Sequence, residues 1–242
     1  MHGLKKKSFL ISMIDPKTYK SLNRKYSGRK ISIYKSINQI KKLEQFNVIV
    51  FAVKPQIAKE VVSKFNYLKN KNILFISIMA GKKINFFTKH LAYPHSIIRA
   101  MPNMPALVEK GMTCFVSNNL TNKSQKLLAN KLFKVVGKVL WLNKELDIDK
   151  ITAISGSGPA YYFLFIELII SEAIKLGLKK SVAKELVYHT ALGSIHMLHK
   201  SERSAEELKK LIAVKGGTTE AAIKVFENKS KFRNIISQAL KA

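Results

Sequence analysis

A change of hydrophobic period near residue 145 constrains this chain more than any other feature. Before it, short apolar runs of strand length alternate with segments of helical pattern, and after it every apolar pattern repeats at helical spacing. Alternation of strands and helices is typical of a parallel, doubly wound sheet with helices on both faces. We therefore predict an α/β domain over residues 1–146 and an all-helical domain over residues 147–242.

The expected strands are short and rich in β-branched and aromatic residues. Residues 48–53 and 73–78 are continuous apolar runs, as expected for strands buried on both faces. Ligands of such sheets bind beyond the carboxyl ends of the strands, so the loops that follow them are candidate sites. Strands are predicted at residues 9–14, 30–34, 48–53, 73–78, 96–100, 112–116 and 139–142, and helices at about 15–28, 36–45, from 55, and from Gly81 to about 91.

Composition excludes some classes of function. The formal net charge is +28, but the lysines are spread over every segment and aromatic residues do not interleave with them, so no nucleic-acid partner is expected. The longest apolar run, residues 160–170, is interrupted by Glu167 and is shorter than the roughly 20 residues that span a bilayer, so no membrane partner is expected. A single cysteine, Cys114, allows no internal disulfide and indicates a cytoplasmic protein.

The helical half predicts a partner subunit. Its first helix is apolar nearly all round, and such a helix must be buried. A domain of this size has little core to cover it, so we expect a homodimer or a higher oligomer built from dimers. The apolar residues are Tyr161, Phe163, Leu164, Phe165, Ile166, Leu168, Ile169 and Ile170.

One segment of the helical half has the features of an anion site. In Lys215–Glu220 two glycines end one helix and Thr-Thr-Glu begins the next. Free backbone N–H groups and the helix dipole at such a start suit a carboxylate or a phosphate. A plain helix cap explains the same residues, and both interpretations remain open. His189, His196 and His199 have no nearby set of carboxylates or cysteines, so no metal site is predicted.

Three further segments are candidate contact loops. The loop at 99–106, R-A-M-P-N-M-P-A, follows a predicted strand, and its prolines stiffen the backbone around Asn103. The segment at 52–56, A-V-K-P-Q, follows another strand, and Lys54 could meet a phosphate. The segment at 155–161, S-G-S-G-P-A-Y, is not a dinucleotide fingerprint, because Tyr stands where Gly or Ala is required. Its glycines allow close approach of a backbone or a ligand.

Taken together and in this order, A-V-K-P-Q, R-A-M-P-N-M-P-A, S-G-S-G-P-A-Y and the G-G-T-T at 216–219 resemble pyrroline-5-carboxylate reductases. The resemblance runs from about residue 8 to the C-terminus. It implies a Rossmann-like domain, a helical domain that interlocks with a partner subunit, and NADPH or NADH as hydride donor. The implied reaction is reduction of 1-pyrroline-5-carboxylate to L-proline, the last step of proline biosynthesis.

The resemblance also implies roles for individual residues. The substrate carboxylate would bind the N–H groups of Gly217, Thr218 and Thr219, and the Thr219 hydroxyl would act in catalysis by hydrogen bonding the ring nitrogen. Catalysis would be mostly positioning, because an iminium accepts hydride readily. No metal is implied. The cofactor-binding residues would be Asn38, Ala52, Val53, Lys54, Pro55, Met101 and Asn103.

The chain departs from the family pattern at three places. The family opens with a strand and a Gly-rich turn that binds the cofactor pyrophosphate, whereas the first glycines here are Gly3 and Gly28. We expect a start site further upstream. Val214-Lys215 stands where the family has Ser-Pro, and Asp15 favours a ribose hydroxyl over a 2′-phosphate, with Lys17 able to offset it, so cofactor preference stays open.

Other functions fit parts of the pattern. The main alternative is a non-catalytic dimeric remnant of such an enzyme that cannot bind the cofactor. A basic nucleic-acid binder would show a steep salt dependence of affinity. A hydroxy-acid dehydrogenase of similar architecture would need a lysine or another acid/base soon after the segment at 155–161, and none follows closely enough.

Overall fold

A computed structural model describes residues 10–28, 30–69 and 72–242. The chain divides into two compact units, Met1–Gly156 and Ser157–Ala242. The sequence placed the change of architecture after residue 146, and the short helix that begins there, α5 (Asp147–Ile151), lies in the first unit.

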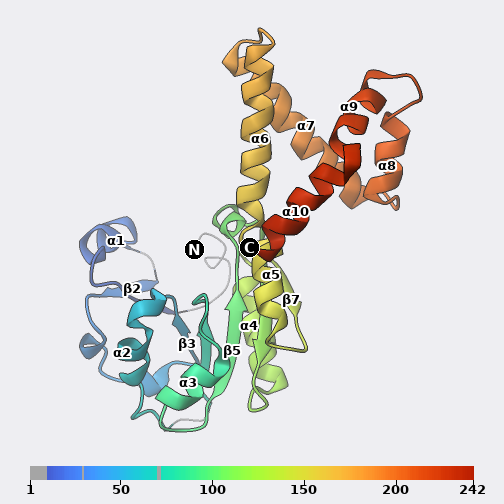
Figure 1. The fold of residues 1–242 in the computed structure, drawn as a ribbon. Coiled ribbons are helices and arrows are strands. Elements are labelled where there is room, and N and C mark those ends of the chain that lie inside the picture. Colours follow the sequence, from blue (N-terminus) through green and yellow to red (C-terminus); the bar gives the residue numbers. More distant parts are fainter. Residues whose placement is uncertain (1–9, 29, 70–71) are drawn as a thin grey trace. The chain divides into compact units, whose positions relative to one another are not determined.

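The strands of the first unit form two hydrogen-bonded sheets in the described residues (Figure 1). One pairs β1 with β2, and the other has the order β3-β4-β5-β6-β7. Pairing is parallel except between β5 and β6, which are antiparallel. The predicted parallel sheet is therefore confirmed apart from that pair. The strands are β1 (Ile11–Ile14), β2 (Ile31–Tyr34), β3 (Val48–Phe51), β4 (Leu74–Ser77), β5 (Ser96–Met101), β6 (Gly111–Ser117) and β7 (Gly137–Trp141).

Helices cover both faces of the larger sheet, as a doubly wound fold requires. Successive residues of a strand face opposite sides, so Phe75 packs in one core with α2 (Ala58–Ser63) and α3 (Ile84–His90). Its neighbours Leu74 and Ile76 pack in a second core with α4 (Lys123–Phe133). The predicted α/β domain is thus confirmed, and its buried strands are apolar because each contributes to two cores.

The helix predicted from Ser36 to about Gln45 is wrong. Two 3₁₀ turns stand there instead, η2 (Ile37–Gln39) and η3 (Leu43–Gln45). The Ser36 hydroxyl accepts a hydrogen bond from the Asn38 N–H at 3.3 Å, and the Gln39 side chain accepts one from the Ser36 N–H at 3.3 Å. This capping box closes one turn, and the chain is extended again at Ile40.

The helix predicted to open at Asp15 begins later. Asp15 Oδ1 accepts hydrogen bonds from the N–H groups of Lys17 and Thr18, at 3.0 and 2.9 Å. These bonds hold a turn, and α1 spans only Tyr19–Lys25. The acidic side chain thus stabilises a turn instead of starting the helix.

The second unit is entirely helical among its described elements, as predicted. A capping box starts its third helix, because Ser204 Oγ accepts from the Glu207 N–H at 3.2 Å and Glu207 Oε2 accepts from the Ser204 N–H at 2.6 Å. The elements are α6 (Gly158–Lys175), α7 (Lys180–Lys200), α8 (Ala205–Ile212), α9 (Thr218–Glu227), η7 (Asn228–Ser230) and α10 (Lys231–Lys241).

Helix α6 exposes most of its apolar side chains. Phe163 and Leu164 are 57% and 54% exposed, and Leu168 is 53% exposed. The helical stretch Asp147–Lys175 is long and apolar enough to cross a membrane by length and composition alone, so the prediction that the apolar run is too short does not hold for the whole helix. Only 6% of its apolar window is buried, which leaves a large apolar surface without a cover in a single chain.

Candidate functional site

The carboxyl ends of β3, β4 and β5 lie at one edge of the larger sheet, because these strands are parallel neighbours. Beyond β3, the predicted residues Ala52 and Lys54 are exposed, whereas Val53 packs against the core below. Pro55 begins η4 (Pro55–Ile57), which leads into α2. The Lys54 side chain is therefore an exposed cation at the edge where ligands of such sheets bind.

The side chain of Asn103 stabilises the loop that follows β5 through three hydrogen bonds. Its Oδ1 accepts a hydrogen bond from the Met112 N–H at 2.8 Å, and its Nδ2 donates to the Ser155 carbonyl at 3.1 Å and to the Ser155 hydroxyl at 3.3 Å. Both ends of the amide are thus engaged within the protein. The loop continues as η5 (Met104–Val108), so Asn103 fixes the backbone that carries Met101 and Pro102.

The glycine-rich segment after α5 approaches Met101 closely. The chain runs from α5 through a π-helical turn, η6 (Thr152–Gly156), into α6. A Cβ at Gly156 would lie 3.2 Å from Met101 Cε and 3.3 Å from Thr152 Cγ2. The glycine therefore makes room for the side chain of Met101, whereas the sequence predicted the close approach of a backbone or a ligand.

A buried cation that the sequence analysis did not single out lies beside this loop. Arg99, on β5, is 2% exposed. Its Nη1 lies 3.4 Å from Glu145 Oε1 and its Nη2 lies 3.2 Å from Asp149 Oδ1. Glu145 Oε1 also accepts a hydrogen bond from the Ile84 N–H at the start of α3, at 2.7 Å. The signal in the sequence was an arginine inside an apolar strand, which must find partners when buried.

Two predicted contacts lie at the smaller sheet. Asn38 is exposed in η2, just after β2. Asp15 follows β1, and its Oδ2 accepts a hydrogen bond from the Thr18 hydroxyl at 2.7 Å. Hydrogen bonds from the side chain and the backbone of Thr18 lower the pKa of Asp15. The carboxylate therefore stays ionised at neutral pH, where it disfavours a neighbouring phosphate.

The predicted substrate residues of the second unit surround one turn. Gly216 has a φ of +77°, a conformation that favours glycine, and Gly217 is the N-cap of α9. The Gly217 N–H donates to the Val214 carbonyl at 3.0 Å. Thr218 and Thr219 occupy the first two positions of α9, where backbone N–H groups have no partner within the helix.

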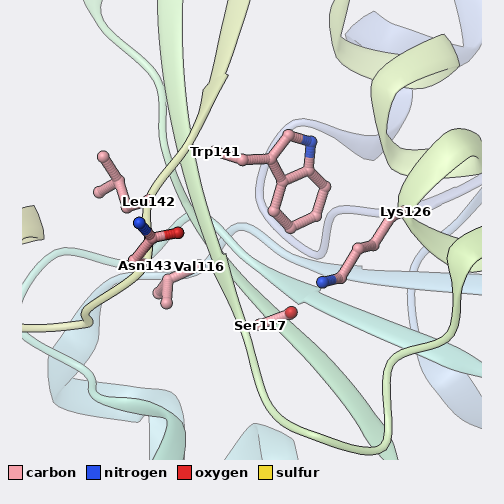
Figure 2. Close-up of a pocket in the computed structure, with 6 residues that line it drawn as sticks. All are labelled: Val116, Ser117, Lys126, Trp141, Leu142 and Asn143. Atoms are coloured by element: carbon pink, nitrogen blue, oxygen red, sulfur yellow. The ribbon is translucent and has the colours of Figure 1, made fainter.

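A separate pocket of about 270 Å³ lies in the first unit. Its lining includes Trp141, whose ring lies 5.3 Å from Lys126 Nζ (Figure 2). Ser117, also in the lining, pairs with Ile98, whereas the predicted residue Met101 pairs with Cys114 further along the ladder. None of the predicted site residues lines the pocket, which is formed by Val116, Ser117, Lys126, Trp141, Leu142 and Asn143.

Among the described residues, no group of three or more His, Cys, Asp or Glu could hold a metal ion. His189, which the sequence analysis considered as a ligand, lies 3.0 Å from Glu185 on the same helix. This is an ordinary exposed pair of side chains four residues apart.

Residues 145–242 match a family model described as pyrroline-5-carboxylate reductase dimerisation. A curated pyrroline-5-carboxylate reductase from Pseudomonas aeruginosa is 38% identical over 196 residues, which are 81% of this chain and 71% of that protein. The match to the family model covers the whole second unit and the helix that leads into it.

Solved structures agree with the sequence relatives. The structure of a pyrroline-5-carboxylate reductase from Coxiella burnetii has a TM-score of 0.82 and 32% identity, covering 97% of this chain and 96% of that one. The structure of a pyrroline carboxylate reductase from Plasmodium falciparum, solved with NADP bound, has a TM-score of 0.81 and 29% identity, covering 97% and 95%. The likeness extends over both units of the chain.

Proposed function

Because this chain belongs to the pyrroline-5-carboxylate reductase family, we propose that it reduces 1-pyrroline-5-carboxylate to L-proline with NADPH or NADH as hydride donor. The observation that carries the proposal is the 38% identity over 196 residues to a curated reductase. The reaction is the last step of proline biosynthesis.

The exposed residues beyond β3 and β5 suit a nicotinamide dinucleotide. Lys54 offers a cation to a phosphate, and the small, exposed residue Ala52 allows close approach of the nucleotide. Val53, Pro55 and Asn38 are proposed to complete the cofactor contacts. Met101 would lie against the nicotinamide, on a loop that Asn103 holds through hydrogen bonds at both ends of its amide. Asn103 then acts by fixing the loop.

The substrate is a small anion, and the turn before α9 suits its carboxylate. The N–H groups of Thr218 and Thr219 at this helix start are proposed to hold the carboxylate, beside Gly217, whose own N–H donates to the Val214 carbonyl at 3.0 Å. The helix dipole adds favourable potential for a negative charge there. The Thr219 hydroxyl is proposed to hydrogen bond the ring nitrogen, which fixes the C=N bond for attack on one face.

The chemistry needs little from the protein beyond orientation. The bound cofactor supplies a hydride to the carbon of the protonated C=N bond, and the nitrogen becomes the amine of proline. The residues of the chain bind the carboxylate, orient the ring and exclude water, which lowers the entropic part of the barrier. No strong acid or base is required, because the protonated imine is already electrophilic.

Helix α6 is proposed to be covered by a second copy of the chain. The family model for dimerisation includes this helix, and its exposed apolar side chains supply the surface that such an interface buries. We propose dimers, or higher oligomers built from them, in the cytoplasm, without nucleic-acid or membrane partners. Cys114, the single cysteine, is buried and forms no disulfide.

The test is a hydride-transfer assay on the full chain. Absorbance of NADH or NADPH is followed after addition of 1-pyrroline-5-carboxylate, and oxidation that depends on the substrate supports the proposal. The Thr219→Val variant is expected to lose most of kcat, since the hydroxyl is removed while the shape is kept. The assay is repeated with the chain extended upstream to any in-frame start. If neither form oxidises a cofactor while both are folded dimers, the protein is a non-catalytic member of the family.

A further inference from the structure

The turn before α9 is closed by a side chain that the proposed function does not use. The Gly216 N–H donates a hydrogen bond to Glu220 Oε2 at 2.9 Å, and Glu220 is the third residue of α9. Its carboxylate therefore reaches back over the first turn of the helix to the residue before the N-cap. We propose that Glu220 is a positioning residue, which holds the Gly216-Gly217 turn in the shape that binds the substrate carboxylate. This inference rests on the proposed function.

The hydrogen bonds of the turn decide which donors remain for a ligand. The Gly216 N–H is taken by Glu220, and the Gly217 N–H is taken by the Val214 carbonyl. The next two N–H groups, of Thr218 and Thr219, begin the helix and have no helical partner. Glu220 thus fixes the backbone from which these two donors project, and an adjacent pair of N–H groups suits a carboxylate.

Lys224 prevents this carboxylate from repelling an anionic substrate. Lys224 Nζ lies 3.1 Å from Glu220 Oε1, whereas the turn bond uses the other oxygen, Oε2. The bond from Gly216 and the interactions with Lys224 lower the pKa of Glu220, so the side chain is ionised at neutral pH. Because the pair is neutral overall, the turn keeps its bond to a charged acceptor without adding a net negative charge beside the substrate.

The arrangement differs from the ordinary cap of the neighbouring helix. At α8, Glu207 reaches back to Ser204, which is the N-cap itself and also bonds the Glu207 N–H. At α9 the bond passes over the N-cap to Gly216, whose φ of +77° is outside the range that other residues favour. An ordinary helix cap is complete without a hydrogen bond to the residue before the N-cap. The additional bond from Gly216 to Glu220 instead fixes the turn in front of the Thr218 and Thr219 N–H groups.

The experiment compares substrate and cofactor kinetics in variants of the full chain. Glu220→Ala is expected to raise KM for 1-pyrroline-5-carboxylate about tenfold, because a hydrogen bond to a charged acceptor is lost. KM for the cofactor and kcat should stay within about twofold, since the helix itself remains. Glu220→Gln keeps an acceptor for the Gly216 N–H and is expected to recover most of the affinity.

Two further variants separate the turn bond from the ion pair. Lys224→Met leaves Glu220 charged and unpaired, so KM for the substrate should rise, and added salt should reduce the rise. Glu206→Gln is the matched control, because Glu206 forms an ion pair with Lys210 at 2.8 Å, also four residues apart, in the first turn of α8. It should leave both KM values unchanged.

A wild-type KM for the substrate in Glu220→Ala overturns the inference, as does a parallel loss of kcat and both affinities that tracks a lower melting temperature. Binding of L-proline, measured by calorimetry, separates this inference from the proposed function. If the wild type does not turn over but binds proline through Glu220, the reductase proposal falls and the positioning role stands. If turnover occurs and the Glu220→Ala variant behaves as wild type, only the positioning role falls.

Discussion

The side-chain amide of Asn103 donates hydrogen bonds to both the carbonyl and the hydroxyl of Ser155, 52 residues later in the chain. The same amide accepts a hydrogen bond from the Met112 N–H. One side chain therefore joins the loop after β5, the start of β6 and the π-helical turn η6. This junction brings together two of the segments that the sequence analysis selected as candidate contact loops.

Asn103→Ala is expected to lower the free energy of unfolding of the first unit by about 2 kcal/mol, because the Met112 N–H and the Ser155 carbonyl lose their partner. Urea unfolding followed by the fluorescence of Trp141, the single tryptophan, measures this unit directly. Asn66→Ala is the control, since Asn66 is exposed and its side chain makes no hydrogen bond in the described structure. If both substitutions lower the free energy of unfolding equally, Asn103 does not stabilise the first unit through these hydrogen bonds.

Glu145→Ala is expected to destabilise the first unit by about 2–3 kcal/mol, because it leaves the buried Arg99 short of a partner and frees the Ile84 N–H. The matched control is Asp149→Ala. The Asp149 side chain is 57% exposed, so its removal should cost less than about 1 kcal/mol. The same tryptophan-monitored titration ranks the two variants, and a reversed order would show that Asp149 is the main partner of Arg99.

The stability of the first unit should fall as the pH drops below about 6.5, the pKa of an unperturbed histidine. His95 is 2% exposed, and neither ring nitrogen has a partner within hydrogen-bond geometry among the described residues. Burial lowers the pKa of His95, and the weaker influence of the Leu68 backbone nearby opposes part of this effect. The unfolded chain therefore binds the proton more readily, and acid favours unfolding in the range between the lowered pKa and 6.5.

His95→Leu removes this titrating group while keeping a buried apolar contact with Phe75. The unfolding midpoint in urea should fall less between pH 7.5 and pH 5.5 in the variant than in the wild type. An undiminished fall would assign the acid sensitivity to other groups.

Paired substitution of Leu164→Glu and Leu168→Glu should dissociate the dimer. These residues lie four apart on α6 and are 54% and 53% exposed, so they share one apolar stripe. Burying two carboxylates against a partner costs more than the interface can offset. Light scattering after size-exclusion chromatography gives the mass, and Lys131→Glu, on the exposed side of α4, should remain dimeric.

Elements whose signal is local could be predicted from the sequence. The runs at 48–53 and 73–78 were identified as strands because they are continuous and apolar. Strand β4 is buried throughout, whereas Val50 of β3 is 45% exposed, so the predicted burial on both faces holds only in part for β3. The predicted helix at 36–45 is wrong because the capping box between Ser36 and Gln39 starts only one turn, after which the chain is extended at Ile40. The antiparallel direction of β6 has no signature in its own residues.

The residues of the candidate site could likewise be predicted only in part from the sequence. Loops such as 52–56 and 99–106 could be selected because they follow strands, and their residues stand at the predicted edge. The partners of Arg99 could not, because Glu145 and Asp149 lie 46 and 50 residues away and only the fold brings them together.

The exposed apolar surface of α6 also makes the stability of the protein depend on its own concentration. If the helical unit is stable only when two chains share that surface, then folding is a second-order event, and dilution acts on it as a denaturant would. A cell that makes few copies would hold a smaller folded fraction as well as fewer molecules. Enzyme activity in the cell would then rise more than in proportion to the expression level.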